Sequence, residues 1–344
     1  MKAAPKRVLL IKLRAIGDVV LATPALAEAR CAWPEAEIDF LTEPACRQVL
    51  EGNPDVSEVL LHDPRAPLRK QVDFVRRIRA RSYELVVDLF GNPRSAWLTL
   101  LSGARTRVGF AFRFRKMAYN VRVAPRGHLV HEVEFNLDAL RAMGVAVGNP
   151  RVHFPVPVAA KRYVEDFLAS MGLSDALLVG LNNSGGWPAK RWVPEKAAEL
   201  ARRLVEHEQA AVIVLWGPGE ENQMRQVATM AGRGALLAPP TDLHQLAALL
   251  ARLRLLVTTD SAPMHIAAAV GTHVVALFGP TNPLLQGPYG PGHVVVRNER
   301  LSCLGCNRTR CDDGRCMSEL EVGTVYAACR KALARQRRGE GKAS

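Results

Sequence analysis

An aspartate, a serine and a histidine stand together in the segment Thr258-Thr259-Asp260-Ser261-Ala262-Pro263-Met264-His265. The segment ends an expected strand and opens an expected helix over 266–270, since proline suits the first turn of a helix and Ser or Asp its cap. Free N–H groups and the dipole at a helix start attract phosphate. Ser261 could add a hydroxyl donor, and His265 could reach the same anion. A lone helical histidine is otherwise a structural or exposed residue.

A second carboxylate follows the first apolar run of the chain. Asp18 ends the loop Lys12-Leu13-Arg14-Ala15-Ile16-Gly17-Asp18, between an expected strand over 7–11 and a helical pattern over 19–29. An aspartate at this place is typical of a helix N-cap. At the mouth of a cleft it could instead act as a general base. Spacing alone does not choose between the two interpretations.

Two tryptophans flank two basic residues in the segment Trp187-Pro188-Ala189-Lys190-Arg191-Trp192. Aromatic faces beside Lys and Arg could stack on rings and neutralise phosphate. The alternative is a tryptophan pair that only packs the domain. The loop Phe278-Gly279-Pro280-Thr281-Asn282-Pro283 follows another expected strand and by its composition indicates a rigid turn.

Four of the seven cysteines fall within 14 residues, as Cys303-x2-Cys306-x4-Cys311-x4-Cys316. Four thiolates at short spacing could hold a structural zinc ion, although zinc sites more often use two separated cysteine pairs. Two alternatives stay open, which are reduced thiols that pack the loop and a disulfide formed on oxidation.

Apolar runs alternate with helical patterns along the chain. Strands are expected over residues 7–11, 38–41, 59–61, 85–89, 177–181, 211–215, 255–258 and 274–278, and helices over 68–81 and 322–336 among others. This alternation predicts an α/β protein with parallel sheets covered by helices. The proline-rich stretch Phe154-Pro155-Val156-Pro157 suits a linker. We expect domains at 1–157 and 158–322, then a C-terminal helix and polar tail at 323–344, with ligands at the carboxyl ends of the strands.

The composition bounds the class of protein. With 344 residues, 48% hydrophobic and 23% charged, the chain is typical of a folded globular protein. Its apolar runs are too short for a transmembrane helix or a signal peptide, so we expect a cytoplasmic protein. The net charge of +13 favours anionic partners such as nucleic acid, acidic lipid or phosphorylated sugars.

Positive charge is concentrated in residues 105–126, which hold no acidic residue. The stretch contains seven basic residues: Arg105, Arg107, Arg113, Arg115, Lys116, Arg122 and Arg126. Four aromatic residues stand between them: Phe110, Phe112, Phe114 and Tyr119. A solvated charge run is the usual interpretation, while an acidic lipid or single-stranded nucleic acid would also suit it.

Five segments taken in order resemble a known family. They are Gly17-Asp18-Val19 with Thr23-Pro24-Ala25-Leu26, Trp187 to Trp192, Asp260 to His265, Phe278 to Pro283, and Gly287-Pro288-Tyr289-Gly290. Together they resemble the bacterial lipopolysaccharide heptosyltransferases, glycosyltransferase family 9. The cysteine-rich segment after Asn298 and the pair Cys316-Met317 are most similar to the heptosyltransferase II branch.

The resemblance implies a GT-B fold, in which two facing Rossmann-like domains enclose an interdomain cleft. It implies that Asp18 is the general base and that Lys190 neutralises the leaving diphosphate. The implied donor-binding residues are Asn183, Ser184, Lys190, Glu220, Asp260, Ser261, Ala262 and His265. The implied acceptor-binding residues are Lys12, Arg14, Arg113, Arg115 and Lys116. Some family members have Thr-Gly where this chain has Ser261-Ala262.

The implied activity is inverting transfer of heptose from ADP-heptose to the lipopolysaccharide inner core, on a lipid A-linked acidic sugar or the first heptose. The sequence holds no Asp-x-Asp, so we expect chemistry that requires no metal or other cofactor. The implied partners are ADP-heptose, an acidic glycolipid and the inner membrane surface, without nucleic acid. Three alternatives are another nucleotide sugar, a nicotinamide dehydrogenase and a nucleic-acid-binding protein. The dehydrogenase ranks low because no Gly-x-Gly-x-x-Gly follows the first strand of either domain.

Overall fold

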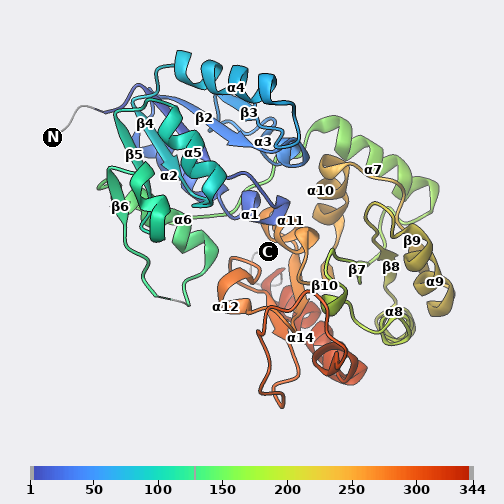
Figure 1. The fold of residues 1–344 in the computed structure, drawn as a ribbon. Coiled ribbons are helices and arrows are strands. Elements are labelled where there is room, and N and C mark those ends of the chain that lie inside the picture. The colour runs from blue at the N-terminus through green and yellow to red at the C-terminus, as the bar shows by residue number, and fades with distance from the viewer. Residues whose placement is uncertain (1–3, 128, 341–344) are drawn as a thin grey trace. The chain divides into compact units, whose positions relative to one another are not determined.

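The computed structural model describes residues 4–127 and 129–340, and the chain divides into two compact units between Pro155 and Val156. Unit 1 is drawn in blue to green and unit 2 in yellow-green to red in Figure 1. The division falls inside the expected linker Phe154 to Pro157. In the described part of the chain, no helix is both long and apolar enough to cross a bilayer.

Unit 1 is a parallel six-stranded sheet in the order β3-β2-β1-β4-β5-β6. Its strands are β1 (Arg7–Ile11), β2 (Glu37–Thr42), β3 (Glu58–Leu61), β4 (Leu85–Asp88), β5 (Thr106–Phe110) and β6 (Val121–Val123). Its helices are α1 (Ile16–Val20), α2 (Thr23–Ala32), η1 (Pro44–Cys46), α3 (Arg47–Leu50), α4 (Leu68–Ala80), α5 (Pro93–Leu101), η2 (Arg113–Ala118) and α6 (Glu132–Arg141). The central strands read as unbroken apolar runs because helices cover the sheet on both faces.

Unit 2 repeats this strand order. Its parallel sheet runs β12-β11-β10-β7-β8-β9. The strands are β7 (Leu178–Asn182), β8 (Ala211–Val214), β9 (Ala235–Leu237), β10 (Leu255–Thr259), β11 (His273–Leu277) and β12 (Val294–Val296). The helices are α7 (Val158–Ser170), η3 (Pro188–Lys190), α8 (Pro194–Glu208), α9 (Glu221–Ala231), α10 (Leu243–Arg252), α11 (Ala262–Ala269), α12 (Pro283–Gln286), α13 (Arg315–Ser318) and α14 (Val322–Glu340). Both sheets therefore have the dinucleotide-fold order 3-2-1-4-5-6 when strands are counted within each unit.

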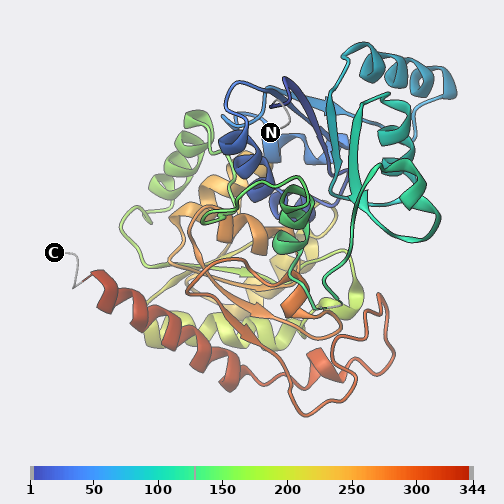
Figure 2. The same cartoon turned by 90° about the vertical axis from the view of Figure 1, so that its left-hand side faces the viewer.

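The C-terminal helix α14 is part of unit 2. Figure 2 shows it in red alongside the yellow-green α8, and its Val325, Cys329 and Leu333 are buried in the same core as β10 and β11. Burial raises the pKa of the Cys329 thiol. The helix therefore completes the apolar cover of the second sheet.

The eight expected strands are present with ends that differ by at most one residue, and four further strands were missed. Three of these, β6, β9 and β12, have three residues each and are edge strands. In the fourth strand, β5, Arg107 and Gly109 interrupt the apolar run that would have indicated a strand. The basic stretch 105–126 is thus β5, η2 and β6 rather than one solvated loop.

Two helix starts also differ from expectation. Helix α11 begins at Ala262, one turn before the expected 266, because Ser261 is its N-cap and Pro263 lies in its first turn. The pattern expected over 19–29 is two helices, α1 and α2. Asp18 is the third residue of α1, and the N-cap is Ala15.

The buried carboxylate of Asp88 ties three parts of unit 1 together. It ends β4, where its Oδ1 accepts the N–H groups of Phe90 and Gly91 at 2.9 Å each. Its Oδ2 accepts the hydroxyl of Tyr119 at 2.6 Å. Burial raises the pKa of Asp88, while these hydrogen bonds act in the opposite direction. The carboxylate thereby anchors both the loop before α5 and the residue that follows η2.

Gly109→Ala tests this anchor, because a Cβ at Gly109 would lie 2.5 Å from Cε1 and Cζ of the buried Tyr119 ring. We expect a loss of about 1–3 kcal/mol in the free energy of unfolding, measured by urea denaturation, since the rigid ring must shift. Gly323→Ala in α14 is the control, because an added Cβ there meets nothing within 4 Å. That control should be neutral or gain up to about 1 kcal/mol. Equal stability of the two variants would contradict the packing described.

Candidate functional site

The strand order marks one place in each sheet where neighbouring strands lead to helices on opposite faces. These places lie between β1 and β4 in unit 1 and between β7 and β10 in unit 2. Loops diverge there at the carboxyl ends of the strands, which makes them the usual ligand sites of such sheets. The loop of Asp18 follows β1, and Asp260 follows β10. The sequence-predicted residues therefore stand at both of these points.

In unit 2, the buried amide of Asn182 is the centre of a polar cluster at the ends of β7 and β10. Its Nδ2 donates to Thr258 Oγ1 and to Ser261 Oγ, each at 2.9 Å. Its Oδ1 accepts the hydroxyl of Ser184 at 2.6 Å. Thr259 Oγ1 donates to the carbonyl of Ser184 at 2.8 Å. The amide therefore fixes the N-cap of α11 against the loop that follows β7.

Lys190 and Asp260 form the main charged pair of this cluster. Lys190 Nζ lies 2.7 Å from Asp260 Oδ2, with the two side chains 14% and 5% exposed. The ammonium also lies 4.2 Å from the ring centroid of Trp187. A cation this desolvated interacts strongly with nearby anions. The pair brings η3 to the start of α11, where a bound phosphate would also meet the helix dipole.

Helix α11 presents the predicted phosphate-binding residues in its first turn. Ser261 is the N-cap, and its hydroxyl donates to the carbonyl of Thr259 at 3.2 Å. Ala262 is the first helical residue, so its backbone N–H belongs to the free donors of the helix start. His265 is buried within the same helix. The serine and histidine thus lie next to the helix terminus, as the sequence predicted.

Glu220 joins two loops of unit 2. Its Oε1 accepts the N–H of Gly185 at 3.1 Å and lies 3.2 Å from Nη2 of Arg191. Its Oε2 accepts the N–H of Gly217 at 3.2 Å. In this structure the carboxylate therefore orders the loops after β7 and β8, whereas the resemblance gave it a contact with the donor nucleoside.

Asn183 and Trp192 hold together the two ends of the loop that follows β7. The amide of Asn183 donates to the carbonyl of Trp192 and accepts its N–H, both at 2.9 Å. The buried Trp192 indole donates to the carbonyl of Leu320 at 3.0 Å. The two tryptophans thus differ, since Trp192 packs the domain and Trp187 lies beside Lys190.

In unit 1, Asp18 lies at the start of α1. Its Oδ2 accepts the N–H of Ala15 at 3.0 Å, the arrangement of a capping box without a side-chain N-cap. The side chain is partly exposed. A carboxylate oxygen that accepts a backbone N–H has a second lone pair with which it can accept a proton. The cap and the general base are therefore compatible roles for Asp18.

Lys12 is deeply buried at the end of β1. Its ammonium donates to the carbonyl of Leu89 at 3.0 Å and to Asn136 Oδ1 at 3.2 Å, and it forms an ion pair with Glu132. These contacts join β1 and β4 to α6. In this structure all three hydrogens of the predicted acceptor-binding ammonium are engaged within unit 1.

The other predicted acceptor residues lie on loops of the same unit. Arg14 is exposed in the loop after β1, and Lys116 is exposed on η2. Arg115 Nη1 donates to the carbonyl of Gly91 at 2.5 Å, which ties η2 to the loop after β4. The side chain of Arg113 lies outside the described part of the structure.

The four clustered cysteines lie on the segment between β12 and α14, and all are free thiols. Burial raises the pKa of Cys316, and the neighbouring thiols Cys303, Cys306 and Cys311 raise it further. Across the residues that the structure describes, no group of three or more His, Cys, Asp or Glu side chains is arranged to hold a metal ion. The zinc interpretation gains no support here and stays a prediction.

Two groups of residues escaped the sequence analysis, although each shapes the site. Asn182 is the hub of the unit 2 cluster, and Glu132 with Asn136 holds Lys12. Arg191, which the sequence analysis noted beside Lys190, contacts Glu220 instead of a phosphate in this structure. Of the missed residues, only Asn182 leaves a local signal, since it is an amide at the end of a buried apolar run.

Comparisons with known proteins agree with this architecture. A family model described as glycosyltransferase family 9 (heptosyltransferase) matches residues 72–316. Lipopolysaccharide heptosyltransferase 1 of Pseudomonas aeruginosa is 28% identical over 328 residues, in an alignment covering 89% of this chain and 87% of the relative.

Two solved structures are also similar. A glycosyl transferase family 9 protein from Veillonella parvula has a TM-score of 0.85 at 24% identity and covers 97% of this chain and 99% of its own. The Escherichia coli heptosyltransferase WaaC, solved with ADP, has a TM-score of 0.75 at 23% identity and covers 95% and 99%. The family model matches most of the residues of this chain, and the solved structures share its fold. This chain therefore belongs to glycosyltransferase family 9 and is a glycosyltransferase of the GT-B fold.

Proposed function

We propose that this protein transfers heptose from ADP-heptose to the inner core of lipopolysaccharide with inversion at the anomeric carbon. The observation that carries the proposal is the Lys190–Asp260 ion pair at the start of α11, in a chain of glycosyltransferase family 9. The named function of the Pseudomonas relative and the ADP bound to WaaC support the donor and acceptor classes.

The donor binds to unit 2 in this proposal. The diphosphate meets the N–H groups at the start of α11, the hydroxyl of Ser261 and the ammonium of Lys190. Both the helix dipole and Lys190 stabilise the negative charge that grows on the leaving phosphate. Asp260 contacts the donor heptose and holds Lys190 in position, which its 2.7 Å ion pair supports. Charge neutralisation by these groups agrees with a reaction that needs no metal.

The acceptor binds to unit 1. Asp18 takes the proton from the acceptor hydroxyl as that oxygen attacks the anomeric carbon, and the bond to the diphosphate breaks on the opposite side of the ring. The N–H of Ala15, 3.0 Å from Oδ2, holds the carboxylate in one orientation. Arg14, Arg113, Arg115 and Lys116 attract the acidic groups of the acceptor.

The proposed acceptor is a lipid A-linked acidic sugar or the first heptose attached to it. The cysteine-rich segment is most similar to heptosyltransferase II, while the relative reported above is a heptosyltransferase 1. We therefore keep both sugars as acceptors. Since such a glycolipid is held in a membrane, we propose that the protein works in the cytoplasm at the inner face of the cytoplasmic membrane.

Thermal unfolding with ADP, ADP-heptose, UDP, GDP and NAD tests the donor. We expect stabilisation by ADP and ADP-heptose alone, since a ligand at about 100 times its Kd stabilises the fold by about 2.7 kcal/mol. Stabilisation by UDP or GDP instead would agree with a glycosyltransferase and would rule out ADP-heptose as its donor. If none of these five compounds changes the melting temperature and the protein is retained on DNA in a salt-sensitive way, the nucleic-acid-binding alternative is favoured.

Asp18→Asn tests the general base. We expect kcat to fall about 10²–10⁴-fold because the amide cannot accept the proton, while the Kd of ADP stays unchanged. Asp73→Asn, at an exposed aspartate of α4, is the matched control and should keep the wild-type rate. Turnover close to that of the wild type in Asp18→Asn would rule out the assignment.

Lys190→Met tests the diphosphate contact. We expect the affinity for ADP, measured by titration calorimetry, to fall about tenfold or more, because a hydrogen bond to a charged group contributes about 1.5–3 kcal/mol. The affinity for adenosine, which has no phosphate, should not change. Lys196→Met is the control, since Lys196 is paired with the exposed Glu321. An equal loss for ADP and adenosine would indicate a general disruption of unit 2 instead.

A further inference from the structure

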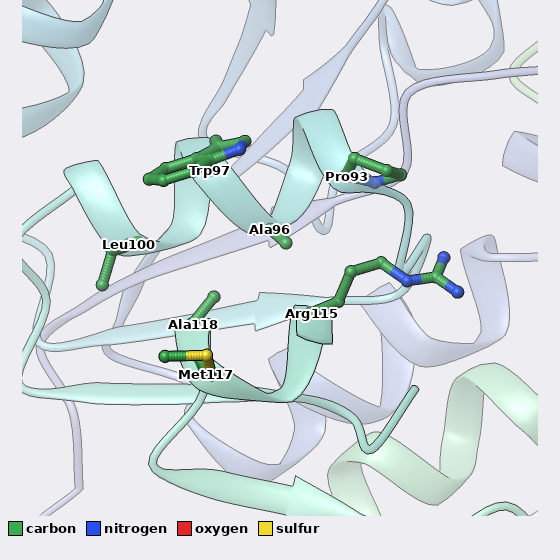
Figure 3. A pocket seen from close by; sticks show the side chains of 7 residues that line it. All are labelled: Pro93, Ala96, Trp97, Leu100, Arg115, Met117 and Ala118. Carbon is green, nitrogen blue, oxygen red and sulfur yellow. The ribbon is translucent and has the colours of Figure 1, made fainter. Parts of the chain in front are cut away.

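Unit 1 has an apolar groove that the proposed chemistry does not use. It lies between α5 and η2, has a volume of about 610 Å³ and is lined by Pro93, Ala96, Trp97, Leu100, Arg115, Met117 and Ala118. Figure 3 shows Ala96 and Leu100 pointing from α5 toward Ala118, which points back from η2. Among the described residues that line the groove, Arg115 alone carries a charge.

Large apolar side chains stand exposed along this groove. Trp97 is 62% exposed, Met117 is 75% exposed and Leu100 is 38% exposed, and Leu101, the next residue of α5, is 40% exposed although it does not line the groove. All four lie on α5 or η2. Contiguous exposed apolar surface with a polar rim is typical of a binding face rather than of ordinary protein surface.

Basic side chains lie next to the groove and form what we call its rim, since Arg107 contacts the backbone of the lining residue Ala118 and Arg122 contacts that of Lys116. Arg107 donates to the carbonyls of Ala104 and Ala118, Arg115 to that of Gly91, and Arg122 to that of Lys116. Within the described residues, none of these guanidinium groups, nor the exposed ammonium of Lys116, is paired with a carboxylate. Backbone carbonyls hold these side chains in place without neutralising their charge. The groove thus combines apolar lining with an uncompensated cationic rim.

One end of the groove, at Pro93 and Arg115, lies at the carboxyl-end edge of the sheet, where the proposed acceptor site also stands. Helix α5 starts from the loop after β4, and η2 follows β5, so both begin at the carboxyl ends of their strands. Strand β4 pairs with β1, whose carboxyl end leads to Asp18. A lipid held at the groove therefore lies on the side of unit 1 where the acceptor hydroxyl is to react.

We propose that the groove and its rim, which we call the α5–η2 face, dock on an anionic lipid bilayer. The inference rests on the proposed function and names the surface that brings the enzyme to its lipid-linked acceptor. Trp and Met side chains enter the boundary between headgroups and acyl chains, and the basic rim pairs with lipid phosphates. A second copy of this chain would bring a like-charged rim against this one, and nucleic acid would leave the aliphatic lining without apolar partners.

Co-sedimentation of the full-length protein with vesicles tests the α5–η2 face. Phosphatidylcholine vesicles are compared with vesicles that also contain about 30 mol % phosphatidylglycerol. We expect binding to increase about tenfold with the anionic lipid and to weaken with added salt. The fluorescence of Trp97 should shift to shorter wavelength on binding, because its indole leaves water.

The double variant Trp97→Ser/Met117→Ser removes the two most exposed apolar side chains of the face. We expect its binding to anionic vesicles to fall about tenfold, with the urea midpoint unchanged because both side chains are at the surface. Met230→Ser, at an exposed methionine of α9, is the matched control and should bind as the wild type does. Undiminished binding by the double variant, or no preference of the wild type for anionic lipid, overturns the proposal.

Turnover on two acceptors separates this inference from the proposed function. The double variant should keep the wild-type rate on a deacylated, water-soluble acceptor and lose rate on the same acceptor embedded in vesicles. If the wild type transfers heptose to neither acceptor, the proposed function fails, while vesicle binding still decides whether the face docks. If the double variant loses self-association in light scattering instead of vesicle binding, the face is a contact between copies and the proposal is overturned.

Discussion

The pairing of β1 with β4 and of β7 with β10 is the constraint on which the rest of this structure depends. These parallel pairs lie at the centre of each sheet, and the chain leaves them toward opposite faces. The loops that diverge at their carboxyl ends carry backbone donors that polar side chains, water or a ligand must satisfy. Asp88 and Glu220 accept some of these N–H groups within the protein. In the proposed function, the helix terminus at Ala262 is the part that binds the diphosphate.

Sequence patterns were sufficient for the central strands because these are buried on both faces and read as continuous apolar runs. The edge strands β6, β9 and β12 are too short to form such a pattern. For the site, Asp18 and Asp260 could be singled out because Asp260 directly follows a buried strand and Asp18 stands at the end of the short loop after another. The partners of Lys12 could not, because Glu132 and Asn136 are more than a hundred residues away in sequence and belong to an ordinary amphipathic helix.

The basic side chains around Lys12 and around η2 differ in whether their charge is neutralised within the protein. Lys12 is surrounded by three acceptors, one at the end of β4 and two on α6, so its charge is used to hold unit 1 together. Around η2, the described guanidinium groups of Arg107, Arg115 and Arg122 donate to carbonyl oxygens, which orient these groups and leave their net charge in place. Position in the network, rather than residue type, therefore decides which basic side chains remain available to anionic partners. The sequence shows where basic residues are concentrated, but it does not show which of them are paired with carboxylates.

The two units repeat the same strand order, and each has its own hydrogen-bond networks. Every hydrogen bond described for the Asn182 cluster comes from unit 2, and every one described for Lys12 and Asp88 comes from unit 1. Substitutions in separate networks of this kind act independently, because energetic coupling is carried by shared contacts. An enzyme built in this way can change one substrate over evolutionary time while conserving the other. Under the proposed function, substitutions that alter acceptor binding in unit 1 therefore leave donor binding in unit 2 unchanged.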